Sequence, residues 1–126
     1  MRRLAAFLIA ASLLMAHHST APFDMTKSTT IHGVVIDFIW TNPHSYIHLQ
    51  SDGHKWTLEA EALNLLRRNG WTKESLKPGD EISCTGARAK DADVYAMKCF
   101  TVEFPDGRKL IATPTGVPSK APVNAR

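Results

Sequence analysis

Apolar and polar residues alternate most clearly in two stretches, residues 44–50 and 55–61, which flank the dipeptide Asp52-Gly53. Alternation of this kind predicts strands, and Asp-Gly favours a type I′ turn, so we expect a β-hairpin here. One register then puts the apolar side chains on a core face and the titratable ones on the other face. The core face pairs Leu49 with Trp56, Ile47 with Leu58 and Ser45 with Ala60, and the polar face pairs Gln50 with Lys55, His48 with Thr57, Tyr46 with Glu59 and His44 with Glu61.

The remaining pattern completes a small β-rich domain. The first strand is apolar on both faces and contains Gly33, which suits a barrel strand that bends to join two sheets. Leu63 and Leu66 share one face of a short helix that Gly70 ends. Three strands, a helix and two strands follow the order of the five-stranded OB barrel, and an antiparallel β-sandwich is the alternative. The expected elements are strands at 31–40, 44–50, 55–61, 81–87 and 94–104, a helix at 62–69 and a last apolar piece at 109–112.

The N-terminus has the features of a secretory signal peptide. Arg2 and Arg3 supply its positive charge, and the apolar run at residues 4–15 is too short to span a bilayer. The best cleavage point follows Ala16, which predicts a periplasmic or secreted protein without a stable membrane anchor. The expected organisation is a signal peptide at 1–16, an OB-type barrel at 17–112 and a flexible, Pro-rich tail at 113–126.

The net charge of the protein falls when the predicted signal peptide is removed. The whole chain has 15 Lys and Arg residues against 12 Asp and Glu, a net charge of +3. Cleavage removes two arginines and no acids, so the mature charge falls to +1. Nucleic-acid binding is disfavoured, because that affinity rests on neutralising phosphates. The sequence also lacks a Ser-His-Asp arrangement, a Gly-rich phosphate loop and a Cys-x-x-Cys motif, which favours a non-enzymatic role.

If the protein is exported, Cys84 and Cys99 can form a disulfide, since the compartments outside the cytoplasm are oxidising. A hairpin that turns at residues 91–92 sets the two cysteines opposite each other, and a closed loop of about sixteen residues contributes about 3 kcal/mol. In that register, however, the apolar side chains that follow Cys99 point away from the core. A bulge or a slipped register separates the cysteines, so both possibilities stay open.

The histidines are the candidates for chemistry. After cleavage behind Ala16, His17 is the N-terminal residue, and its α-amine and imidazole can chelate one metal ion together. Nitrogen-rich sites of this kind favour Cu(II), which leads the divalent affinity order, and His18 adds a second imidazole. The plainer interpretation is that His-His-Ser is an unstructured start without a function.

Two further histidines share the polar face of the hairpin. His44 and His48 lie four residues apart on a strand, about 13 Å, so one ion cannot easily bind both. Glu61 is directly opposite His44, and Glu59 is diagonal to both histidines. The alternative is an ordinary His–Glu pair on a solvated sheet face, which contributes little stability. The remaining histidines, His32 and His54, are expected to be exposed. The predicted metal set is His17, His18 and His44, with Glu59 or Glu61 as a ligand or as the residue that orients a histidine.

Several motifs together resemble a family of small exported bacterial proteins that is known only as a domain of unknown function, DUF family 6152. The resemblance implies a compact β-rich exported domain, with no established activity. Its motif positions include His17, His18, His44 and Glu59, which favours the metal interpretation and Glu59 over Glu61. The motifs are His17-His18-Ser19, Phe23-Asp24, Gly33-x-Val35, Trp40-Thr41-Asn42-Pro43-His44, Trp56-x-x-Glu59, Leu66-x-x-x-Gly70-Trp71 and Leu76-x-Pro78-Gly79-Asp80.

The leading hypothesis is therefore an exported, non-enzymatic protein that binds a metal ion, with copper as the expected cofactor. Imidazole and amine must lose their protons to bind a metal, so we expect binding to weaken below about pH 6. The alternative is a module that binds a small molecule or a partner protein, without metal, on the face of the second and third strands.

Overall fold

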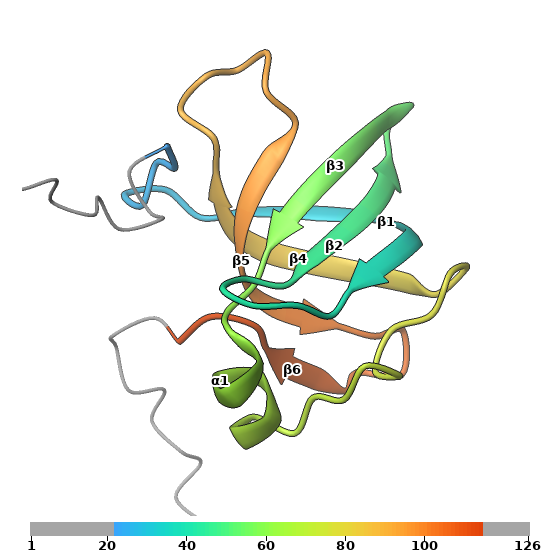
Figure 1. Ribbon diagram of the computed structural model, residues 1–126. Coiled ribbons are helices and arrows are strands. Elements are labelled where there is room, and N and C mark those ends of the chain that lie inside the picture. The colour runs from blue at the N-terminus through green and yellow to red at the C-terminus, as the bar shows by residue number, and fades with distance from the viewer. Residues whose placement is uncertain (1–21, 115–126) are drawn as a thin grey trace, which may run out of the picture.

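The computed structural model describes residues 22–114 (Figure 1). The predicted signal peptide and nearly all of the predicted tail lie outside these residues. Among the described residues, no helix is both long and apolar enough to cross a membrane. The elements are the strands β1 (Thr29–Ile39), β2 (Tyr46–Ser51), β3 (His54–Glu59), β4 (Glu81–Arg88), β5 (Ala96–Glu103) and β6 (Lys109–Ile111), and the helix α1 (Leu63–Arg68).

Five of the strands close into a barrel. β1 pairs antiparallel with both β2 and β4, β2 pairs with β3, and β4 pairs with β5. A parallel pairing between β3 and β5 closes the ring, and β6 pairs with the later part of β5. Figure 1 shows α1 at one end of this barrel. The strand order is that of the OB barrel, so the predicted fold is confirmed, and the short apolar piece at the end of the domain is a sixth strand.

A bulge in β1 changes which side chains enter the core. The register against β2 shifts by one residue between Val35 and Asp37. Val35 is buried before the shift, whereas Phe38 and Trp40 pack against the core after it and Ile36 is exposed. The expectation of two continuous apolar faces along β1 is therefore wrong, because the bulge exchanges the faces partway along the strand.

Cys84 and Cys99 form a disulfide between β4 and β5, with both side chains fully buried and their Cα atoms 6.2 Å apart. The two residues are not directly opposed, because Cys84 pairs with Val102 and Cys99 pairs with Gly86. Phe100 is the extra residue of the bulge that shifts this register. The direct opposition of the cysteines is wrong and the bulge is present, but the bulge does not separate the cysteines as expected, since the disulfide forms across it. The bulge also turns Val102 into the core, which the straight hairpin could not do.

Two glycines allow the closest approaches between strands. A Cβ atom on Gly33 would collide with the carbonyl oxygen of Gln50, and one on Gly86 would collide with that of Lys98. Strands that curve into a barrel need such positions, where the backbones come close together. Gly33 lies next to Val34, where the pairing of β1 passes from β4 to β2.

Candidate functional site

The β2–β3 hairpin has the register that the alternation predicts. Leu49 pairs with Trp56 and Ile47 pairs with Leu58, and all four side chains are buried in the core. The alternate residues of both strands consequently point to the outside of the barrel. The candidate ligands therefore lie on the outer face and not in the barrel interior.

His44 lies at the corner between β1 and β2, and hydrogen bonds hold this corner in place. Oδ1 of Asn42 accepts a hydrogen bond of 3.0 Å from the backbone amide of Leu63, the first residue of α1. Oγ of Ser45 donates a hydrogen bond of 3.1 Å to the carbonyl of Thr41. The Asn-Pro-His motif thus ties the corner to the start of the helix and positions the backbone of His44.

The structure brings His44 and Glu59 together. Nδ1 of His44 lies 3.5 Å from Oε1 of Glu59, the last residue of β3, and the two side chains are 24% and 13% exposed. The pairing of β2 with β3 ends at Tyr46 and Glu59, so His44 lies just beyond the ladder, and its ring contacts Glu59 and not Glu61. Because Nδ1 faces the carboxylate, Nε2 is the nitrogen that remains for a ligand.

A buried lysine that the sequence pattern did not predict joins this pair. Lys98 on β5 is 1% exposed, and its Nζ lies 3.3 Å from Oε1 of Glu59 and 3.5 Å from Oε1 of Glu61. The parallel pairing of β3 with β5 places Lys98 directly beside Glu59. A signal was present, because Lys98 is a lone cation between Met97 and Cys99 in an apolar strand, and a buried charge needs a partner.

We call His44, Glu59, Glu61 and Lys98 the outer-face cluster. Two carboxylates share one ammonium group in it, so Lys98 balances only one of their two negative charges. The remaining negative charge favours a cation close to His44. Glu59 and Glu61 are 13% and 23% exposed, so this charge is open to solvent and to ions.

The described residues supply only part of the predicted metal set. Within residues 22–114, no three His, Cys, Asp or Glu side chains are arranged so that they could hold a metal ion. His17 and His18 lie outside the described residues. The structure therefore places His44 and Glu59 in contact and leaves the N-terminal half of the set as a prediction.

The other histidines have partners of their own. Nδ1 of His48 lies 2.5 Å from Oδ1 of Asp37 on β1, so its carboxylate neighbour is Asp37, whereas the sequence predicted Glu59. His54 is exposed, as expected, and its ring stacks on the ring of Tyr95 with the ring centres 3.9 Å apart. Neither histidine belongs to the outer-face cluster.

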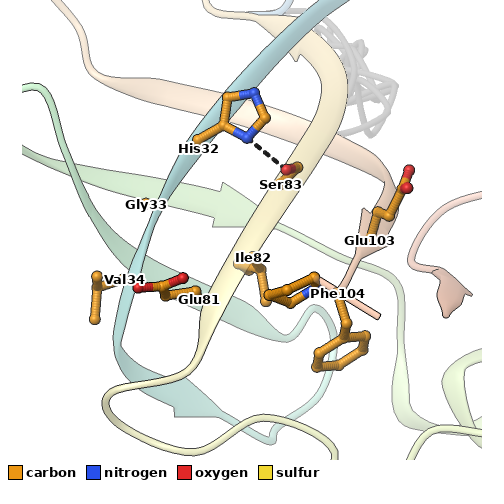
Figure 2. Close-up of a pocket in the computed structure, with 9 residues that line it drawn as sticks. His32, Gly33, Val34, Glu81, Ile82, Ser83, Glu103 and Phe104 are labelled. Carbon is orange, nitrogen blue, oxygen red and sulfur yellow. Dashed lines mark hydrogen bonds between the residues drawn. The ribbon is translucent and has the colours of Figure 1, made fainter. Parts of the chain in front are cut away.

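A separate hollow of about 480 Å³ lies over β1, β4 and β5 (Figure 2). Nδ1 of His32 and Oγ of Ser83 are 2.6 Å apart in it, as the dashed line in Figure 2 marks. Glu103 lies on the far side of Ser83 and pairs with Lys109. The order His–Ser–Glu across three strands is not that of a catalytic triad, in which the histidine stands between the other two residues.

The fold and the cluster define a small barrel of OB type with a polar site on its outer face. The chain belongs to DUF6152, a family of unknown function, whose family model matches residues 6–98. The match confirms the family that the motifs indicated, and it extends from the N-terminal region through the barrel to Lys98. No curated protein matches the chain.

Proposed function

We propose that the chain is an exported copper-binding protein without enzymatic activity, in which His44 joins a chelate formed by the N-terminal His17 and by His18. The contact between Nδ1 of His44 and Oε1 of Glu59, at 3.5 Å, carries this proposal. A carboxylate behind one nitrogen of an imidazole orients the ring and raises the basicity of the nitrogen that binds the metal. The unbalanced negative charge of the outer-face cluster supports the same conclusion.

Glu59 orients His44 in this proposal and does not bind the metal directly. Its Oε1 atom faces both Nδ1 of His44, at 3.5 Å, and Nζ of Lys98, at 3.3 Å. An oxygen that already has two positively polarised neighbours is a poor ligand for a third. The metal ligands are therefore the nitrogen atoms, which are the donors that Cu(II) prefers.

The start of the described chain lies on the face that carries Lys98. Phe23 bridges to Ala89 and packs in a second apolar cluster with Ala96 and Phe100, which flank Lys98 on β5. Only the strand β4 lies between Phe23 and β5, so two strand spacings of about 4.8 Å each separate them. His44 lies beyond β5 and β3, so under this proposal the six residue steps from His17 to Phe23, which span at most about 21 Å, must cross both strands.

Titration with Cu(II) tests the proposal. The protein whose first residue is His17 is compared with a form that carries one extra residue before His17 and with the variant His44→Ala. We expect the extended form and His44→Ala to bind copper about tenfold more weakly, or weaker still, because each loses a nitrogen ligand. His54→Ala is the matched control, since it removes an exposed imidazole outside the cluster and should leave the affinity unchanged.

Two results contradict the proposal. Equal affinity in the processed and extended forms excludes the N-terminal chelate. Equal affinity in His44→Ala and the unchanged protein excludes a site that includes the corner between β1 and β2.

A ligand-binding module without a metal is the second candidate, because OB barrels commonly bind ligands on the face of the second and third strands. Tyr46, which pairs with Glu59 across β2 and β3, is half-buried on that face. If this candidate is right, the unchanged protein binds its ligand in the presence of a metal chelator, and His44→Ala and Tyr46→Ala both weaken that binding. If the copper proposal is right, a chelator abolishes binding in the unchanged protein.

A further inference from the structure

Arg88, at the end of β4, is a cation without an acidic partner. Its guanidinium lies over the rings of Trp56 and Tyr95, with distances of 4.8 and 5.9 Å to the ring centres. Nη2 donates a hydrogen bond of 3.0 Å to the carbonyl of Ala92, whereas Nε is buried and has no hydrogen-bond partner. None of the ion pairs within residues 22–114 includes Arg88.

The two other arginines that lie over aromatic rings differ from Arg88. Arg108 lies 4.5 Å from the ring centre of Phe104, but its Nε is paired with Asp106 at 2.7 Å. Arg67 is exposed on α1, so water can satisfy its donors. Arg88 is partly buried beside two rings and forms no ion pair within residues 22–114, and a guanidinium without a carboxylate partner is a group that proteins use to hold an oxyanion.

The hollow beside Arg88 adds further positive charge. Its volume is about 270 Å³, and it is lined by Lys27, Arg88 and Lys90 together with Asp24. Three positive side chains against one carboxylate leave an excess of two positive charges. Since one water molecule takes up about 30 Å³ of liquid, the hollow has room for a phosphate group and several waters.

The single carboxylate in the hollow is already engaged. The Thr26 hydroxyl and backbone amide donate hydrogen bonds to Asp24, and with Lys27 and Lys90 nearby they hold the pKa of Asp24 below its usual value. Asp24 is therefore ionised at neutral pH, and its Oδ1 faces Thr26. The excess positive charge in the hollow is consequently a permanent feature at neutral pH.

We propose that the hollow between the segment 24–29 and the end of β4 binds a dianionic phosphate group, with Arg88 as its main donor and Lys27 and Lys90 as supporting charges. A doubly charged oxyanion matches the excess of two positive charges. The planar guanidinium presents paired donors to two oxygen atoms, which a lysine cannot do. The site uses none of the residues of the outer-face cluster, so it stands independently of the copper proposal.

Titration of the isotope-labelled full chain with inorganic phosphate, followed by NMR at constant ionic strength, tests the site. We expect saturable shifts of the Nη–H signals of Arg88 and of the backbone amide of Lys90. Sodium chloride at the same ionic strength should not reproduce them. Shifts that never saturate, or that chloride reproduces, contradict the proposal. Parallel titration with O-phosphoserine shows whether the site prefers free phosphate or a phosphate group on a larger molecule.

Variants identify the donors. Arg88→Gln should weaken phosphate binding about tenfold or more, because a charge-assisted hydrogen bond is lost. This variant also loses the stacking on Trp56, so the double variant Lys27→Gln/Lys90→Gln, whose side chains are exposed, tests the charge without touching the core. It should bind phosphate several-fold more weakly. Arg108→Gln is the matched control and should bind normally. Unchanged affinity in both the Arg88 variant and the double variant overturns the site.

Discussion

Lys98 holds the outer-face cluster together from the side that solvent does not reach. Its ammonium group contacts Glu59 and Glu61, and its side chain is 1% exposed. Ala87 is its partner on β4, and Phe100 follows on the same face of β5. A charge in such apolar surroundings is tolerated only because two carboxylates compensate it.

Replacing Lys98 by methionine leaves two neighbouring carboxylates without their shared cation. We expect Lys98→Met to lower the free energy of unfolding by about 3 kcal/mol, at the low end for broken buried pairs because the carboxylates remain partly exposed. Urea unfolding measures this loss. Lys109→Met, which breaks the exposed pair of Lys109 with Glu103, is the control and should cost less than about 1 kcal/mol. Equal losses in the two variants would contradict the structural role given to Lys98.

The two glutamates of the cluster are predicted to differ in their effect on copper binding. Glu59→Gln removes the charge behind the imidazole of His44 and should weaken copper binding about tenfold. Glu61→Gln removes the same charge from a residue whose ion pair is with Lys98, and it should have a clearly smaller effect. Calorimetric titration compares them. A larger effect of Glu61→Gln would show that His44 is not oriented by Glu59.

Among the strands, the alternation of apolar and polar residues predicts the buried face correctly only where a strand has no bulge. The β2–β3 hairpin has a local turn and no bulge, so its register and its buried residues could be predicted in full. β1 and β5 each contain an extra residue, Ile36 and Phe100, which moves the apolar side chains from one face to the other. The bulge in β5 has a signal in the sequence, because a hairpin without it turns the apolar side chains after Cys99 away from the core, whereas no such signal marks the bulge in β1.

Gly86 is expected to be essential for the pairing of β4 with β5 at its bulge. A Cβ atom at this position would collide with the carbonyl oxygen of Lys98, and the neighbouring backbone is held by the ladder. Gly86→Ala should therefore lower the unfolding free energy by about 1–3 kcal/mol. The variant Thr85→Ala, at the adjacent position, loses only a surface contact with Thr30 and is the control in thermal unfolding. A fully stable Gly86→Ala protein would rule out this close packing.

In the molecule as a whole, the closure of the barrel creates contacts between distant segments that the sequence did not predict. The order of strands and helix is readable along the chain, and it led to the OB barrel. The parallel pairing of β3 with β5 joins segments almost 40 residues apart, with Glu59 hydrogen-bonded to Lys98 across a separation of 39 residues. The composition of the candidate site depends on this closure: the hairpin pattern predicted His44 and Glu59, whereas the lone cation in the apolar strand indicated a buried Lys98 but not which carboxylates it contacts.

The intact mass of the exported protein tests whether a chain that starts at His17 binds copper. The full 126-residue chain is expressed in a cell that exports it, recovered from outside the cytoplasm and measured under native conditions before and after addition of one equivalent of Cu(II). We expect a single species that begins at His17 and retains one copper ion. A mature chain that begins at another residue, or one that begins at His17 and retains no copper, would contradict the copper proposal.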